Sequence, residues 1–318
     1  MACLYKNNLS AKGMIIFLIL VFGLTRNVNA ANGIMAPRTN NPSCKTLRSM
    51  ARVYMAYGDY AKAQPLLERA LKQAADNNVS DKELCSCLID AAYVYLGLGR
   101  LSEAEQMCSL GLQLQEKVYF RNHPYVAYTL RNLASIYTEQ GRFQQAMTVM
   151  DRAMAIILES HTENDQTLAP FHVDIAKILV AQGRLQEAEN YYRQALELIN
   201  QSYGPDHLYT AGVLGEVARL YTLQERYLEA EPLIAKAQAA QEKIYGSDHH
   251  MLIPTWLTRA AVYQAKGQLI QSEEMIQMAF STVEKKGNSQ AISKVRQRVA
   301  KIRASRKTVF ETVAKAVN

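Results

Sequence analysis

The chain has 318 residues, of which 49% are hydrophobic and 20% are charged, and its formal net charge is +7. The positive charge lies at the ends: residues 1–30 hold three basic residues and no acidic one, and residues 287–318 hold eight basic residues against one acidic residue. Because the body between them is slightly acidic, the overall charge does not indicate nucleic-acid binding, and we expect no nucleic-acid partner.

The first predicted element is a signal peptide over residues 1–30. Lys6 and Lys12 precede an apolar run over residues 14–24, and Ala30 ends a stretch with small residues suited to cleavage. Eleven apolar residues are too few for a comfortable membrane span, which needs about 20. We therefore expect export, to the periplasm or by secretion, with a linker over residues 31–43. The alternative is an uncleaved membrane anchor formed by residues 14–25.

Cleavage would leave an even number of cysteines in an oxidising compartment, so a disulfide among them is one prediction. The alternative is a set of small, buried, reduced thiols on helices. The four candidates are Cys44, Cys85, Cys87 and Cys108. Cys44 and Cys85 each stand 14 residues before a glycine that marks the repeat described next, and Cys87 could bring a thiol closer to Cys44 than Cys85 does.

From residue 44 onward, glycines recur at a spacing of 41 or 42 residues, with one glutamate standing where a glycine is missing. A large apolar residue follows two positions after each marker, and small residues stand seven before, five after and twelve after it. Small residues let two helices cross closely, and glycine ends a helix by adopting a left-handed backbone. The pattern predicts six helix–turn–helix repeats over residues 44–286. The markers are Gly58, Gly99, Gly141, Gly183, Glu225 and Gly267.

These phased residues resemble the tetratricopeptide repeat in its longer, kinesin light chain-like form. Residues 203–211 and 245–249 resemble the phrase that joins successive repeats of that form. The resemblance implies an all-α, right-handed superhelical solenoid. It also implies a non-catalytic scaffold that binds a partner protein or an extended peptide in its concave groove. Because the sequence lacks a nucleophile elbow, a phosphate-binding loop and an HExxH motif, we expect no enzyme, catalytic residue, cofactor or metal site.

In this resemblance, the first helix of each repeat lines the groove through positions six to ten residues before the marker. Arginine and lysine at these positions can pair with carboxylates of a peptide, and asparagine can form hydrogen bonds with its backbone. Asp90 and Asp174 share the same phase and would repel a terminal carboxylate, so we do not expect the carboxylate clamp of chaperone-binding members. The predicted peptide-binding residues are Arg48, Arg52, Tyr93, Arg131, Asn132, Lys177 and Arg219.

Three histidines, His123, His207 and His249, stand at equivalent positions of three repeats. Asp165 stands at the same position of a fourth repeat. Equivalent helices pack roughly 10 Å apart, which is too far for these side chains to share one metal ion. The residue before each of them is Asn or Asp, which favours a helix N-cap at that position with the histidine in the first turn.

The last predicted element is a basic helix over residues 287–318. Its apolar side carries Ile292, Val295, Val299, Ile302, Val309 and Val313. We expect this helix to cap the apolar face of the last repeat. The alternative is a surface helix in peripheral contact with a membrane. In that case the protein would be a membrane-associated assembly factor, held by an uncleaved N-terminal segment and the basic tail.

Overall fold

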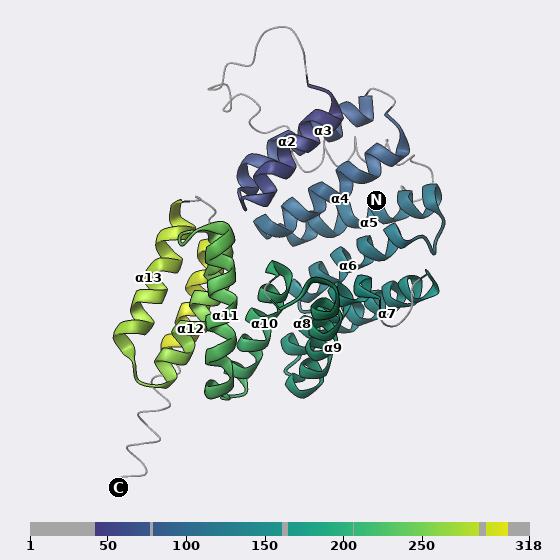
Figure 1. Cartoon of the computed structure of the whole chain (residues 1–318). Helices are drawn as coiled ribbons and strands as arrows, with labels where there is room; N and C mark the ends of the chain where they lie inside the picture. The colour runs from purple at the N-terminus through teal and green to yellow at the C-terminus, as the bar shows by residue number, and fades with distance from the viewer. Residues whose placement is uncertain (1–41, 77–78, 161–164, 206, 286–290, 305–318) are drawn as a thin grey trace, which may run out of the picture. The chain divides into compact units, whose positions relative to one another are not determined.

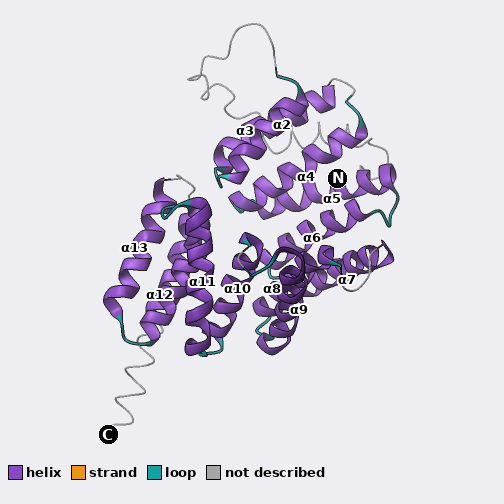
Figure 2. Cartoon of the chain, viewed as in Figure 1, coloured by secondary structure: helices purple, strands orange, loops and turns teal. Residues whose placement is uncertain are grey.

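The computed structural model describes residues 42–76, 79–160, 165–205, 207–285 and 291–304 (Figure 1). All the regular elements in these ranges are helices, and none of these residues is in a strand (Figure 2). No helix in them is long and apolar enough to cross a membrane. The predicted signal peptide, the linker up to residue 41 and the tail beyond residue 304 lie outside the described residues. The chain divides into two compact units, 1–141 and 142–318.

The first unit holds two complete helix pairs and the first helix of a third pair. Within this unit, consecutive helices from α2 to α6 pack against each other, and α4 also contacts α2 and α6. The first helices of this unit therefore lie next to one another. The elements are α2 (Cys44–Ala56), α3 (Tyr60–Asp76), α4 (Asp81–Leu98), α5 (Leu101–Tyr119) and α6 (Pro124–Glu139).

The second unit begins with the second helix of the third pair and continues with three complete pairs. Here too, sequential helices pack together, and the first helices α10 and α12 contact each other. The predicted all-α class and the helix–turn–helix repeats are confirmed. The elements are α7 (Phe143–Ser160), η1 (Gln166–Leu168), α8 (Ala169–Ala181), α9 (Leu185–Tyr203), α10 (Leu208–Leu223), α11 (Tyr227–Tyr245), η2 (His250–Leu252), α12 (Ile253–Ala265) and α13 (Leu269–Lys285), followed by helical residues 291–304.

The marker residues end the first helices as predicted. The five marker glycines have φ between 68 and 78°, in the left-handed region that glycine adopts without a steric penalty. Glu225 takes the same conformation, with φ of 61°, although its Cβ makes that conformation unfavourable. The small residues at the helix crossings are fully buried, as in Ala92, Ala104 and Ala188. In the last repeat Ser272 replaces alanine and donates its hydroxyl proton to the carbonyl of Ala260 at 2.9 Å.

The histidines lie one position away from their predicted role. His123 and His207 are themselves N-caps, and their Nδ1 atoms accept the backbone N–H two residues later at 3.2 Å; His249 does the same at 3.3 Å. The prediction that the preceding Asn or Asp is the cap is therefore wrong. Nδ1 stands as many bonds from the backbone as an Asp or Asn oxygen, so imidazole can replace these side chains as the acceptor. Asp165 caps η1 in the fourth repeat.

Stacking explains why histidine suits these joints. The ring of His207 stacks on Tyr203 with centroids 4.6 Å apart, and His249 stacks on Tyr245 at 4.7 Å. Each tyrosine belongs to the end of the preceding second helix, so the pair joins one repeat to the next. Among the described residues, no group of three or more His, Cys, Asp and Glu side chains is arranged to hold a metal ion.

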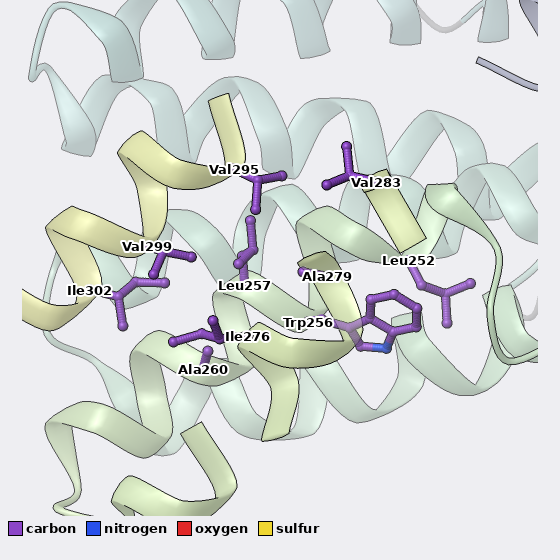
Figure 3. Close-up of a cluster of buried hydrophobic side chains, with 10 residues drawn as sticks. All are labelled: Leu252, Trp256, Leu257, Ala260, Ile276, Ala279, Val283, Val295, Val299 and Ile302. Carbon is purple, nitrogen blue, oxygen red and sulfur yellow. The ribbon is translucent and has the colours of Figure 1, made fainter. Parts of the chain in front are cut away.

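The C-terminal helical residues cap the last repeat. Val295, Val299 and Ile302 are buried in a cluster with residues of α12 and α13. Figure 3 shows these three side chains pointing from their helix toward Leu257 and Ile276. The predicted cap is confirmed over residues 291–304, whereas Val309 and Val313 lie outside the described residues.

Candidate functional site

Two predicted groove residues of the first unit, Arg48 and Arg52, converge on one carboxylate. Arg52 donates from Nε and Nη2 to the two oxygens of Asp90 at 2.8 and 3.0 Å, and Nε of Arg48 lies 3.3 Å from Asp90 Oδ2. Burial raises the pKa of Asp90, while the bond from Arg52 and the charges of both arginines lower it. The three side chains therefore form an ion cluster that joins α2 to α4, in which Asp90 is buried and Arg52 is exposed. Their role as peptide-binding residues stays a prediction.

The other predicted residues of the first unit are Tyr93 on α4 and Arg131 and Asn132 on α6. Tyr93 is 44% exposed, and its ring packs edge-to-face on Tyr60, with centroids 6.0 Å apart. The guanidinium of Arg131 lies over the ring of Tyr128, 5.9 Å from its centroid. Asn132 is half-buried next to Arg131 on α6. An exposed aromatic ring and a cationic group with polar neighbours are suited to contact an extended peptide.

The four predicted cysteines are buried thiols in this structure. The Sγ atoms of Cys44 and Cys87 lie 3.2 Å apart, between α2 and α4. Cys108 Sγ instead lies 3.6 Å from the backbone carbonyl of Thr129. Burial raises the pKa of Cys85 and of Cys108 to about 12. Cys87 rather than Cys85 is therefore the neighbour of Cys44, and a disulfide between these two remains a prediction.

The second unit contains a cavity of about 280 Å³ that brings together two predicted residues, Lys177 and Arg219. Four further groove positions of the repeat phase also line it: Val173, Gly215, Glu216 and Thr258. The remaining lining residues are Tyr209, Gly212, Val213, Gln241, Met251, Pro254, Thr255 and Arg298. The repeat phase alone therefore placed six of the lining residues on this face.

Glu216 is the acidic group of this cavity. Arg219 donates from Nε to Glu216 Oε2 at 2.9 Å, and Nζ of Lys177 lies 3.9 Å from Oε1. Burial alone would raise the pKa of Glu216, but Arg219, Lys177 and Arg298 together bring it below its ordinary value. Glu216 is therefore ionised at neutral pH, and it holds Arg219 in a fixed orientation at the cavity wall.

Other polar side chains that line the cavity with Glu216 are held in place by hydrogen bonds. Thr255 donates its hydroxyl proton to Gln241 Oε1 at 2.9 Å, and Thr258 donates to the carbonyl of Pro254 at 2.8 Å. Thr258 Oγ1 in turn accepts from Nη2 of Arg298 at 2.7 Å. The cavity thus combines fixed polar groups with an apolar wall, an arrangement typical of a ligand-binding pocket.

Arg298 is a site residue that sequence reasoning missed, because it was counted with the basic residues of the tail. A signal was nevertheless present: residue 298 stands three positions after Val295 and four before Ile302, so it shares their face of the helix. A basic residue on an apolar helix face that caps a repeat is directed toward the protein and not toward solvent.

The family comparison identifies the repeats directly. The family model described as tetratricopeptide repeat matches residues 43–109, 83–159, 167–231 and 209–285, which together span well over half of the chain. None of the curated proteins matches the chain in sequence.

Several solved structures share the fold, all at less than 25% identity. BtubC (BKLC) from P. vanneervenii is 19% identical with a TM-score of 0.52, over 77% of this chain and 92% of that one. A Podosopora anserina protein described as a kinesin light chain with nearly identical TPR-like repeats is 22% identical with a TM-score of 0.50, over 64% and 96%. NprR in complex with its cognate peptide NprX is 13% identical with a TM-score of 0.63, over 80% and 71%. The predicted likeness to kinesin light chain-like repeats is confirmed.

Proposed function

Because the chain belongs to the tetratricopeptide repeat family, we propose that it is a non-catalytic scaffold that holds a partner protein or an extended peptide on its first-helix face. The cavity of about 280 Å³ in the second unit carries this proposal, since it gathers the predicted residues Lys177 and Arg219 with fixed polar groups. A preformed site on packed helices loses little ordering entropy when a ligand binds.

Proteins of the same fold support the proposal. NprR has been solved with its cognate peptide NprX, and a Rap protein with the Competence and Sporulation Factor. The Rap protein has a TM-score of 0.61 and is 12% identical, over 83% of this chain and 76% of that one. Two proteins of this fold therefore form complexes of the kind proposed here.

The proposal is tested by selecting peptides from a random display library on the immobilised full chain, and by measuring the selected peptides by fluorescence polarisation. We expect Lys177→Glu to weaken binding by about tenfold, because it adds a second carboxylate beside Glu216. Lys236→Glu, an equal charge change on an exposed position of the second helix α11, is the matched control. A library that yields no binder would refute the peptide-binding function, and equal effects of the two substitutions would exclude this face as the binding site.

The first unit provides a separate arm of the test. We expect the double substitution Arg131→Ala and Asn132→Ala to reduce peptide capture while leaving the far-UV circular dichroism spectrum unchanged, because both side chains are at least partly accessible on α6. Unchanged capture would confine the binding face to the second unit.

We also propose that the protein is exported. The basis is the apolar run over residues 14–24 behind Lys6 and Lys12. Mass spectrometry of the mature protein should find a chain that begins near Ala31. A chain that retains residues 1–30 would instead favour the membrane-anchored assembly factor.

A further inference from the structure

Arg298 has an unusual position for a basic side chain. Its helix is fixed by the burial of Val295 and Ile302 against the last repeat, and Arg298 itself lines the cavity of the second unit. Its guanidinium makes one hydrogen bond, to Oγ1 of Thr258 at 2.7 Å, and no ion pair with any carboxylate of the described residues. Most of its five N–H donors are therefore left for another partner.

The charge balance of the cavity is positive. Lys177, Arg219 and Arg298 line it together with a single acidic residue, Glu216, which already pairs with the first two. Burial and the nearby charge of Arg219 lower the pKa of Arg298 to about 10, against the attraction of Glu216. Arg298 nevertheless stays protonated at neutral pH, and a partly buried cation without an ion pair favours an anion at its side.

We propose that the cavity binds a carboxylate of the bound peptide through Arg298, an inference that rests on the peptide-binding function proposed above. A carboxylate is planar and carries one charge, so it matches the one guanidinium that lacks an ion pair and can accept two parallel N–H bonds from it. Glu216 disfavours a more highly charged group such as a phosphate dianion. The volume of about 280 Å³ accommodates one acidic side chain or one chain end. The helix that caps the repeats thereby also completes the binding site.

The binding test compares a selected peptide with its neutral analogue, in which each acidic side chain is an amide and the C-terminus is amidated. For the full chain, we expect Arg298→Met to weaken binding of the acidic peptide by about tenfold or more. Binding of the neutral analogue should stay almost unchanged. Arg296→Met is the matched control, since it removes the same charge from an exposed position of the same helix. Equal losses for both peptides, or for both variants, would overturn the proposal.

A second variant tests whether a loss of binding comes from a loss of folding. Arg298→Lys keeps the charge and most of the side-chain length, so we expect the cap to remain folded by circular dichroism while the fork of N–H donors is lost. This variant should bind the acidic peptide more weakly than the wild type and more tightly than Arg298→Met. If Arg298→Lys binds as tightly as the wild type, the bidentate contact is refuted.

A carboxylate probe separates this inference from the proposed function. The Nε–Hε resonance of Arg298, assigned by its loss in Arg298→Met, is followed by NMR while small molecules are added to the full chain. N-acetylglutamate α-amide presents a side-chain carboxylate, N-acetylglycine presents a terminal one, and N-acetylglutamine amide presents none. We expect a saturable shift with one or both carboxylates and none with the amide. No shift, or an equal shift with the amide, would refute the carboxylate site even if peptides bind; a library without binders would refute only the peptide function.

Discussion

Gly97 offers a sharp test of the packing between neighbouring repeats, because a single methyl group placed there has no room. A Cβ built at Gly97 would lie 2.6 Å from Cδ2 and Cε2 of Tyr60 and 2.8 Å from Cγ, whereas carbon atoms in contact are normally about 3.5–4.0 Å apart. The three atoms are consecutive members of one rigid ring, so the whole ring must move by roughly 1 Å. Tyr60 also packs against Tyr93, which opposes that movement.

The two opposing effects give the expected magnitude. Overpacking of this kind costs about 1–3 kcal/mol, while replacing glycine by alanine inside a helix gains up to about 1 kcal/mol. Gly97 stands next to the last residue of α4, where the helix-propensity gain is smaller. We therefore expect Gly97→Ala to lower the free energy of unfolding by about 1–2 kcal/mol, measured by urea denaturation with circular dichroism.

Two other helical glycines provide the controls. A Cβ at Gly212 meets nothing within 4 Å, so Gly212→Ala should stabilise the protein by up to about 1 kcal/mol. At Gly111 the atom nearest to an added Cβ is Ile89 Cγ1 at 3.2 Å, and the other repeats have a small residue, alanine, at the equivalent position. The change in the free energy of unfolding caused by Gly111→Ala should therefore lie between those of Gly97→Ala and Gly212→Ala. If Gly97→Ala proves as stable as Gly212→Ala, Tyr60 is free to move and the packing argument is refuted.

Three further predictions concern backbone strain, protonation and oxidation. Glu225→Gly should raise the free energy of unfolding by about 0.5–1 kcal/mol in a urea titration, because it relieves a left-handed non-glycine backbone. His172 is half-buried, its Nδ1 atom is buried with no hydrogen-bond partner among the described residues, and desolvation lowers its pKa. The folded state therefore takes up its proton less readily than the unfolded state, so urea titrations should show stability lost as pH falls below about 6.5, and less of this loss in His172→Gln. Excess glutathione disulfide should oxidise Cys44 and Cys87 to one disulfide, with two glutathione thiols released, as read by non-reducing peptide mapping. Burial raises the pKa of both thiols, so this reaction should quicken as pH rises.

Each of these has a contradicting result. Unchanged stability of Glu225→Gly would mean that the turn is not strained. An identical pH dependence of wild type and His172→Gln would assign the titration to other groups. Peptide mapping that finds Cys85 joined to Cys44, or all thiols unreacted after long exposure at alkaline pH, would contradict the observed sulfur pair.

Much of the fold could be predicted because a helical repeat is encoded locally. The marker glycines, the buried alanines and the apolar rhythm each depend on neighbours within one or two turns of helix. Glu225 shows how strong this constraint is, since it adopts the left-handed backbone that glycine has in the other repeats. The N-cap histidines were misplaced by one residue, because composition does not distinguish an Asp oxygen from an imidazole Nδ1 in the same geometry.

The candidate site was predicted only in part. Phase alone placed Lys177 and Arg219 on the face that lines the cavity, because equivalent positions of successive first helices line one surface. Phase could not show that Arg48 and Arg52 share the carboxylate of Asp90, because that contact joins two helices of different repeats.

The sequence by itself determined the repeat, its helices, the left-handed turns and the residues of the first-helix face, since all of these follow from spacing along one chain. Only the tertiary structure decided which charges meet. It brought the cysteines of α2 and α4 to 3.2 Å, and it directed Arg298 of the capping helix onto Thr258, 40 residues earlier in the chain. The physical reason is that ion pairing and desolvation depend on distances between helices, which small differences in packing set and no local pattern encodes.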